Sequence, residues 1–544
     1  MVGNIHKLPR NPSTPRTAGD IMTLASPEVA PELQAGKINQ EPQKVGDLRV
    51  SDKDGDWKEK DDLDRPQDLE EQSDVTAEAW IIFDITFDGP DDPLNPLNWP
   101  NREKWAVTLL CSMSGLVTLM SGTMMAPALS TIGNDLRLDM AAANLALSIY
   151  VLAYAFGPLL LAPSTEIYGR RPVWLLSGTF YIIFNTVCGF AQNNATMIAA
   201  RFLAGIGASA EFAVTNPVLA DCWRPEQRGH SLAISTFIPL LGTAIGPIIG
   251  GVITEKIGWR WLFWIVSIFS GLITITGFFL FKEPYAAIIL ARKAKAVRKS
   301  GEHDQYAQHE RSTQTLWQKL RITLTRPMRL LLTQPTLQVM SVFMAYNFGI
   351  NYIMFSTFAE LWTQRYGQTV SQSGLNYIAL AIGNTIAAQI GARVTDRIWA
   401  HLKNRASGVT APEYRVPMMI PGSLLIPIGL FWYGWAGELK AYWVLTDIGV
   451  AIFAAGIILG TQAMQAYVLD SFPKYTSSAT AASQFLRSIT AFAFPIFAPG
   501  MYQALGYGWG NSLLGFLSLM IGVPAPLLLW KFGSKLRAKG KAQW

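Results

Sequence analysis

The sequence predicts an all-α membrane protein with twelve transmembrane helices, and three observations support this prediction. Half of the 544 residues are hydrophobic, and the mean hydropathy is +0.21 even though the first hundred residues are very polar. From Trp105 onward, apolar stretches recur at about the 20-residue length that an α-helix needs to cross a bilayer. Lys and Arg gather in every second loop between these stretches, as expected for a chain that crosses a membrane repeatedly.

The predicted spans form two groups of six, separated by a long polar and basic loop. The residues before the first span mix Pro, Ser, Asp, Glu and Lys with few aromatic side chains, so they can bury too little apolar surface to become ordered. The expected organisation is a disordered cytoplasmic tail at 1–78, a pre-membrane segment at 79–104, an N-terminal six-helix half at 105–281, a cytoplasmic central loop at 282–336, a C-terminal six-helix half at 337–532 and a basic cytoplasmic tail at 533–544.

Charge and cysteine content argue against several classes of protein. The formal net charge is +6, but the basic residues lie in loops, so they indicate topology and not nucleic-acid binding, and they place both termini in the cytoplasm. Cys111, Cys188 and Cys222 fall in or beside spans, which predicts neither a disulfide framework nor a zinc site. No nucleotide-binding, metal-binding or nucleophile motif is found, so we expect no cofactor, no metal and no enzymatic activity.

A charged turn between the second and third spans has the most informative sequence, GPLLLAPSTEIYGRRPVWL, which begins at Gly157. Lipid cannot solvate Glu166, Arg170 and Arg171, so this turn must lie at a membrane surface. The paired arginines predict that this surface is cytoplasmic. Gly169 permits a backbone turn that residues with a Cβ resist, and arginine makes bidentate contacts that tolerate partial burial.

This turn resembles the signature between the second and third helices of major facilitator superfamily transporters, in the form GP…P-S-x-E-x-x-GRRP of fungal drug:H+ antiporters with twelve transmembrane helices. Residues 91–100, DDPLNPLNWP, likewise resemble the lead-in to the first helix of many fungal facilitators, although a turn with an interfacial tryptophan also explains them. The resemblance spans residues 91–537. It implies the major facilitator fold, with two pseudo-symmetric halves and a substrate site near the membrane midplane.

The resemblance also implies a latch at the cytoplasmic face. Asp221, just beyond the fourth span, would pair with Arg170, and Glu166 would face the start of the eleventh span near Thr476, where a helix dipole favours a carboxylate. Such a latch would hold the outward-open state. The alternative is a topogenic turn with surface salt bridges. In the second half, Asp396 and Arg397 are the expected counterparts of Glu166 and Arg170.

The fourth span, at 197–220, carries two charged residues, Arg201 and Glu211. Each midplane charge costs about 2.5–3.5 kcal/mol on insertion scales, so both must face protein or a water-filled path. On one continuous helix they lie about 15 Å apart along the axis and cannot pair. Arg201 matches an arginine that the family links to proton coupling. We expect Glu211 to titrate or to meet a cationic substrate; the alternative is a structural glutamate bonded to a neighbouring helix.

The fifth span contains GTAIGPIIGG, in which glycine recurs at every fourth position and forms a smooth face for close helix approach. With the WRWLFW that follows, it resembles the fifth-helix motif that is associated with antiporters, with Thr243 departing from the usual pattern. The residues of this motif are Gly242, Gly246, Pro247, Gly250 and Gly251.

Polar and aromatic residues in other spans suggest a roomy amphipathic cavity, with helix–helix hydrogen bonds as the alternative. The cavity residues that we expect are Phe212, Asn216, Tyr346, Asn347 and Gln462. The predicted function is proton-coupled export of lipophilic or cationic small molecules across the plasma membrane, by a monomer in the lipid bilayer. The alternatives are proton-coupled uptake of a small solute such as a vitamin or polyamine, and a nutrient sensor with a transporter fold.

Overall fold

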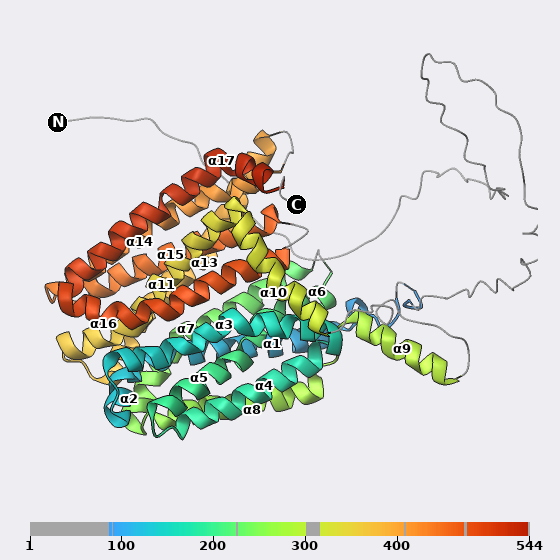
Figure 1. Ribbon diagram of the computed structural model, residues 1–544, viewed down its shortest axis with the longest axis horizontal. Helices are drawn as coiled ribbons and strands as arrows, with labels where there is room; N and C mark the ends of the chain where they lie inside the picture. The colour runs from blue at the N-terminus through green and yellow to red at the C-terminus, as the bar shows by residue number, and fades with distance from the viewer. Residues whose placement is uncertain are drawn as a thin grey trace, which may run out of the picture. The chain divides into compact units, whose positions relative to one another are not determined.

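A computed structural model describes residues 86–541, apart from residues 90, 225–226, 301–315, 407–409 and 473–475. Throughout this part of the chain the ordered elements are helices, and no β-strand is present (Figure 1). The tail expected at 1–78 and the first seven residues of the pre-membrane segment lie outside the described residues.

The N-terminal half contains eight helical segments, because two of its six spans are each built from two segments. They are α1 (Asn101–Thr123), α2 (Leu129–Leu136), α3 (Met140–Tyr168), α4 (Arg170–Gly189), α5 (Asn194–Ala208), α6 (Ala210–Cys222), α7 (Arg228–Lys256) and α8 (Arg260–Leu280). The 3₁₀ turn η2 (Ala126–Ala128) joins α1 to α2.

The C-terminal half follows two helices of the central loop, α9 (Ala286–Ser300) and α10 (Leu316–Thr333), in a segment that was expected only to be a polar loop. Its segments are α11 (Pro335–Glu360), α12 (Val370–Leu375), α13 (Tyr377–Arg405), the 3₁₀ turn η4 (Pro412–Met418), α14 (Met419–Glu438), α15 (Trp443–Ser471), α16 (Thr476–Gly522) and α17 (Pro524–Lys541).

The prediction of twelve spans is confirmed. Ten stretches of the described chain are helices long and apolar enough to cross a membrane, and α13, which packs along α15, is a further span with more polar residues. The last of the ten, Ser478–Gly540, counts as two, because its backbone leaves the helical conformation at Gly506 (φ 71°). Tyr502 then bonds to Asn511 and stacks on Tyr507, as in a helical hairpin.

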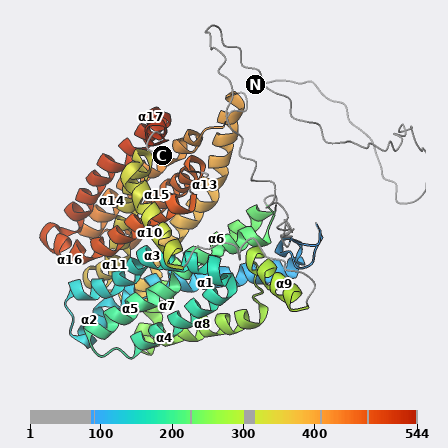
Figure 2. The same ribbon diagram turned by 45° about the vertical axis from the view of Figure 1, so that its right-hand side comes forward.

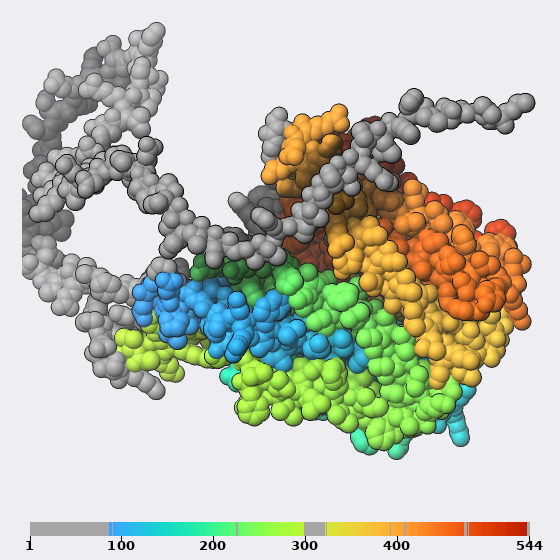
Figure 3. All heavy atoms as spheres, turned by 180° about the vertical axis from the view of Figure 1, so that it is seen from behind, coloured from blue at the N-terminus to red at the C-terminus, as the bar shows by residue number. Residues whose placement is uncertain are grey.

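The two halves form two helix bundles that lie side by side, the first coloured blue to green and the second yellow to red (Figures 1 and 2). In the first, α1 packs on α7, α3 on α5 and α4 on α8; in the second, α11 packs on α16 and α14 on α15. Helices α3 and α16 are in contact across the boundary, and Figure 3 shows the halves adjoining from behind.

Hydrogen bonds join the halves at one end of the bundle. The amide of Ser371, at the start of α12, donates to the Glu255 carboxylate at 2.9 Å, and its hydroxyl lies 3.5 Å from the Gly251 carbonyl. Gly374 is packed so closely on α7 that a Cβ there would lie 2.7 Å from the Pro247 carbonyl. We call this the opposite end, and we call the end with the Gly169–Arg171 turn the motif end.

The lead-in to α1 is an ordered capping structure at the motif end. Asp92 accepts hydrogen bonds from the amides of Asp88 and Leu94, and these bonds lower the pKa of its carboxyl. Lys104 donates to the Leu97 carbonyl at 2.8 Å. Trp99, which the sequence suggested as an interfacial anchor, is instead buried in an apolar cluster, because the turn folds it back onto the helices.

Candidate transport and gating sites

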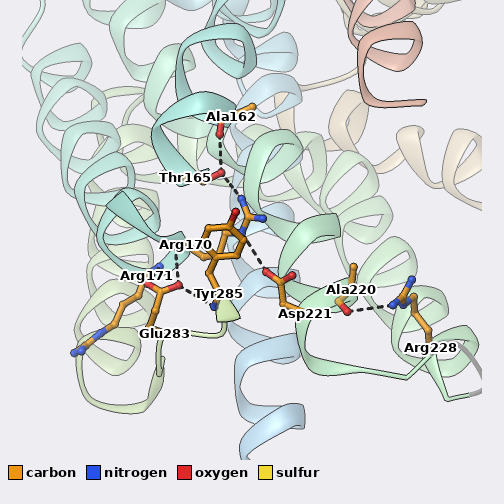
Figure 4. A network of polar contacts seen from close by, with 9 residues as sticks. All are labelled: Ala162, Thr165, Arg170, Arg171, Ala220, Asp221, Arg228, Glu283 and Tyr285. Carbon is orange, nitrogen blue, oxygen red and sulfur yellow. Dashed lines mark hydrogen bonds and ion pairs between the residues drawn. The ribbon is translucent and has the colours of Figure 1, made fainter. Parts of the chain in front are cut away.

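The turn between α3 and α4 is organised by Glu283, which follows α8. Its carboxylate accepts hydrogen bonds from the amides of Arg170 (2.9 Å) and Arg171 (3.0 Å), so it caps the first turn of α4 (Figure 4). Gly169 has a φ of +97°, and a Cβ at this position would lie 2.4 Å from the Glu283 carboxylate. Glycine is therefore required here by conformation and by space.

The Arg170 side chain joins three elements at this end. Its Nε lies 3.2 Å from Oδ2 of Asp221 in α6, and one Nη donates to the Thr165 hydroxyl in α3 at 2.5 Å. The guanidinium also covers the Tyr285 ring, with 4.4 Å between Cζ and the ring centre (Figure 4). Only 8% of Arg170 is exposed, and buried guanidinium groups persist when they are paired in this way.

Two further arginines bind carbonyl groups at helix ends, where a cation is favoured by the helix dipole. Arg171 donates to the Phe278 carbonyl near the end of α8 at 2.7 Å. Arg228 donates to the carbonyl of Ala220 (Figure 4) and to that of Trp223, both at 3.1 Å. The motif end of the N-terminal half is therefore tied together by arginine.

Glu166 has a different environment. It is exposed in the last turn of α3, and it makes no hydrogen bond or ion pair with any residue that the structure describes. Helix α3 does pack against α16, whose first residue is Thr476. No hydrogen bond or ion pair therefore joins Glu166 to the described residues at the start of α16, where the latch was expected.

The second half contains a counterpart of the Arg170–Asp221 pair, but it uses a different arginine from the one expected. Arg415, in η4, lies 3.1 Å from Asp470 at the end of α15 and 3.3 Å from Asp396 in α13. Arg397 is exposed. The assignment of Arg397 as the counterpart of Arg170 was wrong, because Arg415, from beyond the next loop, binds the acidic residue at the end of the following span.

Arg201 is completely buried in the first half. Its Nε lies 3.4 Å from the Ala146 carbonyl, and its Nη1 lies 3.1 Å from the Ser121 carbonyl and 3.4 Å from the Ser121 hydroxyl. The guanidinium stacks on the Tyr150 ring at 4.3 Å, and its Nη2 has no hydrogen-bond partner.

Glu211 lies just beyond a break in the fourth span, which was expected to be one continuous helix. The break falls at Ser209 (ψ −10°), where a Cβ on Gly157 of α3 would lie 1.8 Å from the Ser209 hydroxyl oxygen. Glu211 is 9% exposed, and its Oε2 has no hydrogen-bond partner. A Cβ on Gly115 in α1 would lie 2.7 Å from its other oxygen. The carboxyl group therefore fills the space left by a glycine.

The glycines of α7 make the close helix contact that their spacing predicted. A Cβ would lie 2.5 Å from the Leu116 carbonyl at Gly242, 2.8 Å from the Met120 carbonyl at Gly246 and 2.1 Å from the Met124 carbonyl at Gly250. Gly251 and Pro247 instead face α12 of the second half, where a Cβ on Gly251 would lie 2.6 Å from the Val370 carbonyl. One helix thus contacts α1 and the other half of the protein.

The five residues expected to line a cavity have different environments. The Tyr346 hydroxyl donates to the Leu514 carbonyl inside the second-half core, which is the helix–helix alternative, and Asn347 is buried with its amide nitrogen unpartnered. Phe212 packs edge-on against Tyr154, with ring centres 5.1 Å apart. Asn216 is exposed and Gln462 is partly buried.

Several residues at these sites were not singled out from the sequence. Glu283 had a usable signal, since an acidic residue directly follows an apolar span in FKEP, but nothing local pairs it with a turn 113 residues away. Tyr150 and Ser121 carry no pattern that links them to Arg201. Asp447, in α15, is a further carboxyl group within a span, and its Oδ1 is buried without a partner.

Comparisons with known proteins agree with this architecture. Residues 111–495 match the model of the Major Facilitator Superfamily. The chain is 42% identical to efflux pump vrtL of Penicillium aethiopicum over 84% of this chain and 91% of that protein. It is 39% identical to probable efflux pump mfs2 of Aspergillus flavus (77% and 100%) and 35% identical to efflux pump radE of Floropilus chiversii (84% and 86%).

Among solved structures, the xylose transporter XylE from E. coli superposes with a TM-score of 0.58 at 17% identity, over 79% of this chain and 99% of that chain. At 17% identity the match shows the fold and nothing about the function. Together with the family match over most of the chain, it identifies a multi-pass membrane transporter. The chain belongs to the major facilitator superfamily and, within it, groups with fungal efflux pumps.

Proposed function

We propose that the protein exports lipophilic small molecules, such as toxins or secondary metabolites, across the plasma membrane in exchange for protons. Its relatives vrtL, mfs2 and radE are named efflux pumps and align over most of both chains, which supports the direction of transport. The antiporter-like glycines of α7, which make close contacts with α1, support exchange. Both termini would be cytoplasmic, as the basic loops at the motif end require.

The observation that carries the proton-coupling part of this proposal is the buried carboxyl group of Glu211 with one oxygen unpartnered. Burial of an ionised carboxylate is costly, and this cost disappears when the group takes up a proton. The carboxyl group also lies against Gly115 of α1, at the point where the Pro239 ring of α7 packs on the same glycine. A change in its charge would therefore act on α7, the helix that contacts the other half at Gly251.

Alternating access would then move the halves between two arrangements. In the present one, Ser371 and Glu255 join the halves at the opposite end, while Glu166 is unpartnered at the motif end. In the other arrangement, Glu166 would bind the first turn of α16 and hold the motif end closed. The contacts between α3 and α16 leave these two elements in a position to meet.

The test is export of the neutral lipophilic dye Nile red from a transporter-deficient fungal strain. Wild type should lower the dye content of the cells, and a protonophore should abolish this effect. Glu211→Gln, which stays neutral at every pH, should reach the membrane but fail to export against a gradient. Asp91→Asn, which removes an exposed carboxylate outside the membrane, serves as the control.

Two outcomes would contradict the proposal. If Glu211→Gln exported the dye with the pH dependence of wild type, Glu211 would have no part in coupling. If wild type instead raised the dye content in proportion to the proton gradient, the protein would be an uptake system.

A further inference from the structure

Each half of the protein buries an arginine that has no acidic partner. Arg201 of α5 is fully buried, bonds only to Ala146 and Ser121, and leaves Nη2 unpartnered. Arg487 of α16 is 8% exposed, and its Nε is buried without a partner. Neither forms an ion pair with any residue that the structure describes. Buried charges are normally paired, so two uncompensated guanidinium groups call for an explanation.

The two arginines adjoin one cluster of aromatic rings at the boundary between the halves. Arg201 stacks on Tyr150 at 4.3 Å, and Arg487 stacks on Phe348 at 4.2 Å. Tyr150 and Tyr352 are buried in the same core cluster, and Phe348 packs against it. A Cβ on Gly122 would lie 3.6 Å from both the Tyr150 ring and the Tyr352 hydroxyl, which brings these two side chains from opposite halves together.

Tyr352 lies between the two charges. It is one helical turn from Phe348, on which Arg487 stacks, and it lies near Tyr150, on which Arg201 stacks. Arg201 lies behind the Tyr150 ring and is fully covered, whereas Arg487 and Tyr352 are 8% and 7% exposed. A ligand that enters between the halves and reaches this ring cluster would therefore meet Arg487 before the fully covered Arg201. It would feel Arg201 through the low-dielectric interior, where charges interact over longer distances than in water.

We propose that the substrates include amphipathic anions, in which an aromatic body carries a carboxylate or phenolate group. The anionic group would bind Arg487 beside Tyr352, and the aromatic body would lie against Phe348 and its neighbouring rings. This inference rests on the proposed export function and specifies its substrate class. It departs from the weakly cationic compounds that the polar residues of the spans suggested, because two buried cations repel a cationic ligand.

The test is binding of three fluorescent probes to the purified full-length protein in detergent. The probes 1-pyrenebutyrate, 1-pyrenebutanol and 1-pyrenebutylamine share one aromatic body and differ in charge. Wild type should bind the butyrate about tenfold or more tightly than the amine. Arg487→Gln should weaken butyrate binding by about tenfold or more, the size expected for one charge-assisted hydrogen bond, and should leave butanol binding unchanged.

Further variants separate binding from a structural role. Arg487→Lys should keep most of the preference for the anion, and Arg201→Gln should reduce it less than Arg487→Gln does. Arg102→Gln, which removes an exposed arginine at the start of α1, should have no effect. Equal binding of the three probes by wild type, or tighter binding of the amine, would overturn the proposal. Equal weakening of all three probes by Arg487→Gln would also overturn it, since that result indicates a structural role.

These measurements do not depend on the direction of transport or on a proton gradient. If the anion preference holds but Nile red is not exported, the export function fails and the charge preference stands. If Nile red is exported in a proton-dependent way but the preference is absent, the anion proposal fails alone.

Discussion

The Nε of Arg170 lies 3.2 Å from Oδ2 of Asp221 and ties the start of α4 to the end of α6. The second half repeats this contact, with the Nε of Arg415 3.1 Å from Oδ2 of Asp470 at the end of α15. In both halves an arginine at the start of one span thus holds the end of the next. The Arg170 side chain is about half as exposed as that of Arg415 (10% against 20%), so the first pair is the better shielded from water.

Arg170→Ala should leave the protein at the membrane but sharply reduce export, because it frees α6 from α4 at the motif end. Loss of a partly buried hydrogen bond between charged groups should lower the free energy of unfolding by about 1–3 kcal/mol. Export of Nile red and thermal unfolding of the purified protein measure the two effects. Arg397→Ala, at an exposed arginine of α13, should change neither. Normal export by Arg170→Ala would exclude the gating role of this turn.

Substitutions of two glutamates at the motif end should affect different properties: Glu283→Ala should lower stability, and Glu166→Ala should slow transport. Glu283→Ala removes the cap of α4, which should cost about 0.5–2 kcal/mol and lower the melting temperature. Glu166→Ala removes an exposed side chain that has no partner among the described residues, so it should leave the melting temperature unchanged but slow export if the latch forms during transport. A lower melting temperature for Glu166→Ala, with normal export, would contradict this assignment.

The sequence predicted the spans well because the bilayer sets their length and excludes charge from their surfaces. Contacts between segments far apart in the chain were harder to predict. The break at Ser209 fits against Gly157 of another helix, and the nearby Gly205 and Gly207 do not by themselves predict where it falls, since glycine is common in membrane helices. Arg415, and not Arg397, takes the place that corresponds to Arg170, and it reaches Asp396 because a loop returns the chain 19 residues later. Neither relationship has a signature in the residues next to it.

The glycine face of α7 offers a matched pair of substitutions. Gly250→Ala would place a Cβ 2.1 Å from the Met124 carbonyl, a backbone atom that cannot rotate away, so α1 and α7 must separate. We expect a marked fall in melting temperature and in export. Gly271→Ala, in α8, has no atom within 4 Å of the added Cβ, and it should be neutral or stabilising by up to about 1 kcal/mol, since alanine favours helix over glycine. Equal effects of the two substitutions would contradict the packing.

A reversible cross-link between positions 255 and 371 should stop transport, because it would hold the halves together at the opposite end. In the double variant Glu255→Cys with Ser371→Cys, a short bis-methanethiosulfonate, which joins two thiols through reducible disulfide bonds, should link the halves at the opposite end, because these residues are in hydrogen-bond contact in the present arrangement. Background labelling should be low, since Cys111, Cys188 and Cys222 are all buried. Export should stop on cross-linking and recover when the link is reduced.

The control for this cross-link is a second pair at the motif end, Glu166→Cys with Thr476→Cys. In the present arrangement Glu166 makes no hydrogen bond or ion pair with the described residues at the start of α16, so this pair should react more slowly in the resting protein than the Glu255–Ser371 pair. If the halves alternate, cross-linking at one end should suppress reaction at the other, because each end can close only when the other opens. Efficient reaction of both pairs in the same molecules, with export intact, would show that the two ends do not alternate.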